Sequence, residues 1–91
     1  MKTETDYPLP LVHSNGTGFK TLSEDYEIAA DKLEEFIDAW ANIEFNARDY
    51  YVIDSDAYSK ARDKRDEMNA RIRAIKEYIL QHRISILEQK K

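Results

Sequence analysis

The sequence predicts an all-α protein: a long antiparallel helical hairpin with an extended N-terminal strip, assembling into a four-helix or larger bundle. In the first half of the chain, apolar residues recur every seven positions in two registers, as in helices that pack lengthwise on one another. A similar but interrupted pattern runs through the second half. The two registers of the first half are Phe19, Tyr26, Leu33 and Trp40, and, offset by three residues, Leu22, Ala29, Phe36 and Ile43.

The 91 residues predict a single domain over 1–91. It begins with a flexible tail at residues 1–6, followed by an extended strip and turn at residues 7–16. Pro8 and Pro10 bias the strip toward extended backbone, and the dipeptide at 15–16, Asn-Gly, is a turn signal. Because apolar side chains alternate with these prolines, we expect the strip to lie on another surface of the protein.

The first helix is predicted over about 18–43. Two candidate caps precede or begin it: Thr17 as a simple N-cap, or a capping box formed by Thr21 and Glu24. Phe19 already follows the heptad pattern, which favours the earlier start after Thr17.

Residues 44–54 break the heptad period and are rich in aromatic side chains, so we predict an ordered loop rather than a solvated linker. Asp54 or Ser55 is the expected cap of the second helix, with Asp56 in its first turn, where a negative charge is favourable. The second helix is predicted over about 55–88, which contains no glycine or proline.

A second apolar stripe, Leu80, Ile84 and Leu87, lies near the end of this helix, away from its heptad seam. A helix that is apolar on two faces is buried on two sides. We therefore predict that this stripe is an oligomer interface or is covered by Leu9 and Leu11 of the N-terminal strip. The oligomer is expected to be at least a dimer.

Two polar residues occupy heptad positions of the second helix that call for apolar side chains. Arg65 is expected to reach an acidic residue of the first helix, such as Asp31 or Glu35, because a buried charge is costly unless it is paired. His82 is expected at a wet part of the seam, or as a residue that sets the register of packing.

Charge is distributed unevenly along the chain. Residues 1–56 carry four Lys or Arg and thirteen Asp or Glu, whereas residues 57–91 carry ten and five. We expect the acidic and basic helices to complement each other within the hairpin or between subunits. A nucleic-acid partner is not expected, because Asp63, Asp66 and Glu67 interrupt the basic residues.

Composition excludes several classes of function. The chain has no cysteine, so it has neither a disulfide nor a thiolate nucleophile, and with two glycines it has no glycine-rich phosphate loop. It shows no nucleophile–base pair and no cluster of metal ligands. We therefore expect a non-enzyme without cofactor or metal, and, since no apolar run approaches about 20 residues, no membrane partner.

Two short motifs stand apart from the helical pattern. In the first, His13, Asn15 and Thr17 lie at the expected start of the first helix, where free backbone N–H groups can bind an anion such as phosphate. The plainer interpretation is that Asn15 and Thr17 form the turn and cap, while His13 bonds the local backbone.

The second motif comprises Arg48, Asp49, Tyr50 and Tyr51. Arginine can bind phosphate or carboxylate through two hydrogen bonds, and arginine with tyrosine is typical of protein-interface hot spots. Alternatively, Arg48 and Asp49 close the loop while the tyrosines and Phe45 fill the end of the hairpin. The motifs are about 25 residues of helix apart, so they can form one site only between antiparallel subunits or through a folded-back strip.

These motifs, P-L-P-x-x-H-x-N-G-T at 8–17 and N-x-R-D-Y-Y at 46–51, resemble those of a family of small uncharacterised proteins encoded by tailed bacteriophages. The resemblance implies a phage accessory protein in the host cytoplasm and implies no reaction. Members of that family often carry an acidic residue three positions after the threonine, where this chain has Lys20.

The leading functional prediction is a phage-encoded, non-enzymatic accessory protein that binds and modulates or inhibits a host defence or regulatory protein. One alternative is an oligomeric sponge that sequesters an anionic, nucleotide-like ligand. A further alternative is a structural assembly factor. The residues that we expect to bind the partner or ligand are His13, Asn15, Thr17, Arg48, Asp49, Tyr50 and Tyr51.

Overall fold

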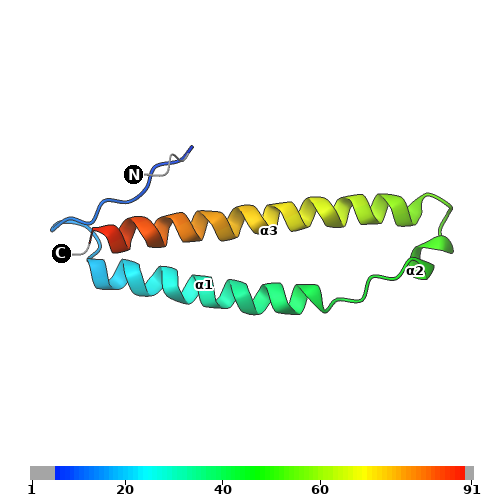
Figure 1. The fold of residues 1–91 in the computed structure, drawn as a ribbon, viewed down its shortest axis with the longest axis horizontal. Helices are drawn as coiled ribbons and strands as arrows, with labels where there is room; N and C mark the ends of the chain where they lie inside the picture. Colours follow the sequence, from blue (N-terminus) through cyan, green and yellow to red (C-terminus); the bar gives the residue numbers. More distant parts are fainter. Residues whose placement is uncertain (1–5, 90–91) are drawn as a thin grey trace.

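The computed structural model describes residues 6–89, which form two long helices and one short helix. α1 spans Phe19–Ala41, α2 spans Arg48–Tyr51 and α3 spans Ala57–Glu88. α1 and α3 pack side by side in opposite directions, and α2 lies in the loop between them (Figure 1). The molecule is a rod of 60 × 24 × 21 Å. The predicted fold of two long packed helices is thus confirmed, while most of the tail predicted at 1–6 lies outside the described residues.

The ends of the long helices differ from the predictions. Gly18 is the N-cap of α1 and no side chain caps that helix, so the predictions of a Thr17 cap and a Thr21 capping box are wrong. Asp56 is the N-cap of α3. The carboxylate of Asp54 accepts the backbone N–H of Asp56 at 2.8 Å, so it closes the turn before the helix instead of capping the helix.

The first apolar register of α1 is buried more than the second, of which only Leu22 is half-buried. Tyr26, Leu33 and Trp40 are half-buried, whereas Phe36 and Ile43 of the second register are exposed. Among the described residues, only Ile86 and His82 of α3 are buried. A single helix pair therefore leaves much of its apolar surface in contact with solvent.

Polar contacts hold the middle of the seam. The indole N–H of Trp40 donates to Asn69 at 2.6 Å, and Glu34 of α1 forms an ion pair with Lys76 of α3 at 3.0 Å. Arg65 donates to the carbonyl oxygen of Trp40 at 3.2 Å, and its guanidinium carbon lies 4.8 Å from the centre of the Trp40 ring. Arg65 thus stacks on an aromatic ring, and the predicted ion pair with Asp31 or Glu35 is not formed.

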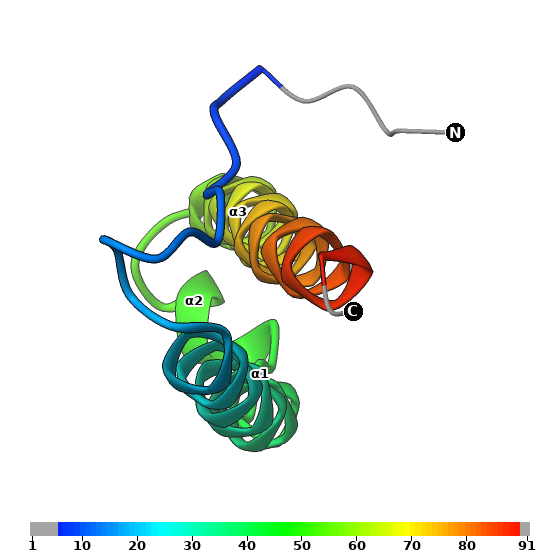
Figure 2. The ribbon, with the colours of Figure 1, turned by 90° about the vertical axis from the view of Figure 1, so that its left-hand side faces the viewer.

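The N-terminal strip folds back along the C-terminal part of α3 (Figure 2). The amide of Gln89 accepts the backbone N–H of Val12 at 2.7 Å and donates to the carbonyl oxygen of Pro10 at 3.0 Å. Further along, the Tyr7 ring lies 4.8 Å from that of Tyr78 and 5.7 Å from that of His82. One side chain, that of Gln89 directly after α3, therefore both accepts from and donates to the backbone of the strip.

The strip does not bury the second apolar stripe. Leu80, Ile84 and Leu87 stay 45%, 40% and 49% exposed, and Leu11 of the strip is also exposed. Within one chain, the stripe is thus available to another molecule.

None of the helices in residues 6–89 combines the length and apolar character needed to cross a bilayer.

Candidate binding surface at the loop end

Backbone hydrogen bonds order the loop that joins α1 to α3. The N–H groups of Asp49, Tyr50 and Tyr51 bond to carbonyl oxygens three or four residues earlier, at 3.0–3.2 Å, which builds the single turn of α2. The N–H of Ile53 then bonds to the carbonyl oxygen of Tyr50 at 3.0 Å. Two consecutive turns therefore fix the path of the chain around the end of the rod.

An aromatic cluster packs these turns against the start of α3. The ring of Phe45 lies 5.4 Å from that of Tyr50 and 5.5 Å from that of Tyr58 on α3. The Tyr51 ring meets Tyr58 edge-on at 6.2 Å. Aromatic pairs at these separations attract one another beyond the effect of buried area, so the loop is anchored to the first turn of α3.

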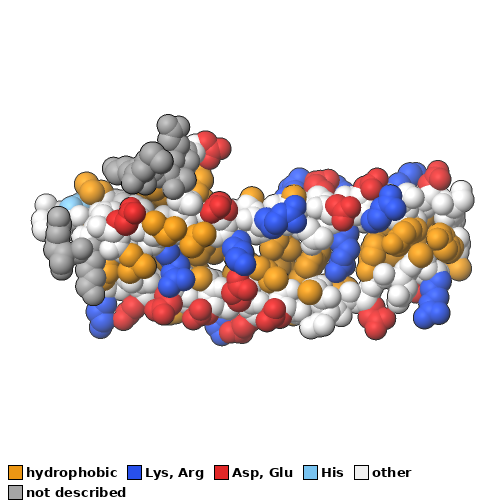
Figure 3. Space-filling view, viewed as in Figure 1, with side chains coloured by type: hydrophobic (Ala, Val, Ile, Leu, Met, Phe, Trp, Pro, Cys, Tyr) orange, Lys and Arg blue, Asp and Glu red, His pale blue; other side chains and the backbone are white. Residues whose placement is uncertain are grey.

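Next to this cluster, three consecutive residues keep most of their side-chain surface exposed to solvent. Tyr51, Val52 and Ile53, which we call the loop tip, are 60%, 86% and 68% exposed. Figure 3 shows apolar side chains gathered at this end of the rod. Isolated exposed apolar residues are common, so three adjacent ones make the loop tip a candidate binding surface.

Charged side chains beside the loop tip are also unengaged. Arg48 and Asp49 are exposed, and within residues 6–89 neither side chain makes a hydrogen bond or ion pair. The predicted Arg48–Asp49 network that would close the loop is therefore absent from the described structure, whereas the aromatic filling by Phe45 and Tyr50 is present. Arg48 and Asp49 remain free to bind groups outside this chain.

The other motif lies at the opposite end of the rod. His13, Asn15 and Thr17 are all exposed in a turn closed by the bond from the N–H of Gly16 to the carbonyl oxygen of His13, at 3.2 Å. A Cβ atom on Gly16 would lie 2.7 Å from Nε2 of His13. The imidazole ring therefore lies directly against this glycine, and a side chain there would have to displace the exposed ring of His13.

The two sets of predicted site residues do not meet within one chain. The turn at 13–17 precedes α1, and the motif at 48–51 follows it, so the 23 residues of α1 separate them (Figure 1). At 1.5 Å per residue, this helix is roughly 35 Å long. A joint ligand site for both motifs would need a second subunit.

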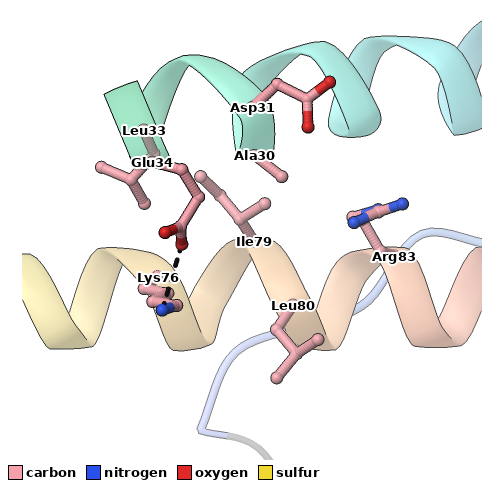
Figure 4. Close-up of a pocket in the computed structure, with 8 residues that line it drawn as sticks. All are labelled: Ala30, Asp31, Leu33, Glu34, Lys76, Ile79, Leu80 and Arg83. Atoms are coloured by element: carbon pink, nitrogen blue, oxygen red, sulfur yellow. Dashed lines mark ion pairs between the residues drawn. The ribbon is translucent and has the colours of Figure 1, made fainter. Parts of the chain in front are cut away.

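A shallow groove of about 180 Å³ lies between α1 and α3 along the rod (Figure 4). Its rim carries Asp31 and the Glu34–Lys76 ion pair, with Arg83 further along. Opposite charges above an apolar floor suit a polypeptide surface better than a small anion. The residues that form the floor are Ala30, Leu33, Ile79 and Leu80.

Contacts within the chain shift the pKa values of some of its titratable groups. Hydrogen bonds from Lys64 and Arg71 lower the pKa of Glu67, and partial burial raises the pKa of Tyr26. The first shift is an effect of side-chain hydrogen bonds and the second is an effect of packing. The part of the chain that the structure describes holds no group of three or more His, Asp or Glu residues able to hold a metal ion.

The sequence reasoning missed Val52 and Ile53 as surface residues. The sequence did contain a sign of their exposure. They continue an apolar run that begins at Tyr50 and ends before Asp54, and this run lacks the heptad spacing of a packed helix. Their exposure, however, depends on the turns and the aromatic cluster beneath them, and no sequence pattern gives it.

Comparisons with protein-family models, with curated proteins and with solved structures find no match to this chain. The likeness to the phage family, which rests on the two motifs, therefore stays a prediction.

Proposed function

We propose that this chain is a phage-encoded accessory protein that acts without catalysis, by binding a host defence or regulatory protein through its loop end. The observation that carries the binding mode is the ordered, exposed loop tip. The phage origin and the host cytoplasm as its place of action rest on the two sequence motifs.

The chemistry of the loop end favours a protein partner. Tyr51, Val52 and Ile53 offer apolar area that is already held in place, so binding would cost little conformational entropy. Arg48 and Asp49 beside them can form charge-assisted hydrogen bonds once they are shielded from water. An apolar centre with a charged rim is the usual arrangement of a protein–protein interface.

Such a protein would act stoichiometrically. A partner that covers the loop tip would be held away from its own ligand or assembly for as long as the complex lasts. This mode needs no cavity, and it needs the rod only as a support for one end.

The test is a quantitative pull-down from bacterial host lysate with wild-type protein and the variant Val52→Asp. The change places a charge in the middle of the loop tip, and an unpaired charge buried in an interface typically costs about 3 kcal/mol or more, roughly a hundredfold in affinity. We expect a host protein that the wild type retains and that Val52→Asp loses.

Ile28→Asp is the matched control. Ile28 is 57% exposed on α1, away from the loop end, so this variant undergoes the same kind of change and should retain the host protein like the wild type. Recovery of no specific host protein by the wild type, or equal loss with both variants, would contradict the proposal.

A further inference from the structure

We propose that the groove face of the rod, formed by the groove together with Leu80, Ile84 and Leu87, binds the same face of a second copy of this chain. The two-fold axis runs along the rod, so that α1 of each copy lies on α3 of the other. This proposal is independent of the host partner.

The chain exposes more surface than a folded monomer of its size. The chain exposes 7301 Å², whereas a folded monomer of 10.7 kDa typically exposes about 5,500 Å². The excess is larger than the roughly 800 Å² per partner that a standard interface buries. A second copy is thus a sufficient source of the missing burial.

The exposed stripe lies on the side of α3 away from the N-terminal strip. Leu80, Ile84 and Leu87 fall within about 60° of one another around α3, and Leu80 also lines the groove. On the other side of α3, Tyr78, His82 and Gln89 are engaged by the N-terminal strip. The groove face is therefore the side of this end of α3 that the chain's own strip leaves open.

Charge decides how the two copies are oriented. α1 carries seven acidic and two basic side chains, and α3 carries eight basic and five acidic ones. When two groove faces meet about an axis along the rod, each α1 lies on the partner's α3. An axis across the rod would instead place α1 on α1 and α3 on α3, which opposes like charges. The first arrangement also makes all neighbouring helices of the bundle antiparallel.

The heptad supplies a specific contact. Glu34 pairs with Lys76 within the chain. One heptad further from the loop, toward the end of the rod where α1 begins and α3 ends, which we call the open end, the equivalent residues are Glu27 and Arg83. Neither forms an ion pair with any other residue in 6–89. A two-fold axis along the rod keeps residues at the same level, so Glu27 of one copy lies beside Arg83 of its partner.

This arrangement places both loop tips at one end of the bundle and both turns at 13–17 at the other. The two motifs stay a helix length apart between subunits, as they do within one chain. A single nucleotide site built from both motifs is therefore incompatible with this dimer.

The face is tested by sedimentation equilibrium of Ile84→Glu and Ile75→Glu. The two isoleucines lie half a turn apart on α3 and are 40% and 52% exposed, so the substitutions are matched and neither removes a buried residue. We expect the wild type and Ile75→Glu to be dimers and Ile84→Glu to be a monomer of unchanged helix content. A monomeric wild type, or a monomer only with Ile75→Glu, would overturn the proposal.

The orientation is tested by mixing two single variants, Glu27→Arg and Arg83→Glu. In the homodimer of either variant alone, like charges lie beside each other at two positions. This homodimer should therefore dissociate about tenfold more readily at low salt than the wild-type dimer. In a mixture, the heterodimer regains two opposite-charge contacts, so native mass spectrometry should find it in excess over both homodimers. A statistical mixture of the three species would refute the axis along the rod.

Discussion

The two ends of the rod use the same kind of aromatic packing but differ in what covers it. At the open end, the rings of Tyr26 and Tyr78 lie 5.0 and 4.1 Å from that of His82, and Tyr7 of the N-terminal strip adds a further layer. There His82 is 3% exposed and Ile86 is fully buried. At the loop end, a similar cluster has no covering segment, and Val52 stays 86% exposed.

Because of this difference, one end of the rod can stabilise the fold while the other stays available for binding. Two helices bury one seam, and full burial of a side chain requires a third segment, which the strip supplies only at the open end. Because burial stabilises roughly in proportion to apolar area, we expect the open end to hold the fold together. The loop end is free to bind another molecule at small cost to folding.

The largest expected effect is that of Ile86→Ala. Removing a fully buried isoleucine typically costs about 2–5 kcal/mol, whereas Val52→Ala at the exposed loop tip should change the free energy of unfolding by less than about 0.5 kcal/mol. Urea unfolding at one fixed protein concentration measures both. Equal costs at the two positions would show that the ends do not differ as proposed.

A smaller effect is expected for Gln89→Glu. The carboxylate keeps the acceptor for the N–H of Val12 but loses the donor to the carbonyl oxygen of Pro10, so the strip should be weakened by about 1 kcal/mol. Hydrogen exchange of the Val12 amide should accelerate about fivefold, while amides of α2 exchange as in the wild type. Unchanged exchange at Val12 would mean that Gln89 does not hold the strip.

The smallest effect concerns alkaline pH. Partial burial, with Tyr78 and Asp25 nearby, raises the pKa of Tyr26 above its ordinary value of 10.0. The folded state therefore favours the neutral phenol, and this contribution is complete below pH 10 and is lost as the pH rises through the folded-state pKa. The melting temperature should fall less steeply above pH 10 in Tyr26→Phe than in the wild type. Tyr51→Phe, which removes a hydroxyl at the loop tip, is the control and should keep the wild-type slope.

Sequence reasoning located the parts whose formation is local. The heptads predicted both long helices to within two residues at each end, because a helical stripe is set by spacing along the chain. The prolines predicted the extended strip, and the aromatic run predicted an ordered loop. Thr17 failed as a cap because Gly18, in extended conformation, begins the helix.

Contacts between distant residues could not be predicted in the same way. Arg65 was expected to need a carboxylate, but the rings of Trp40 and Phe45, 4.8 and 5.1 Å away, and a carbonyl oxygen accommodate its charge. Gln89 carried no signal of its contact with the strip, because its partners are 77 and 79 positions away. Such pairings depend on how the helices cross, which short-range patterns do not encode.

By itself, the sequence determined that this protein is two long amphipathic helices of opposite charge, joined by an aromatic loop. Helix formation and charge are properties of neighbouring residues and can be read along the chain. Only the tertiary structure decided which apolar register is buried more, which end the strip covers and which apolar residues stay exposed. Those outcomes depend on which apolar surfaces pack against one another, and this is defined only when all segments are in their folded positions.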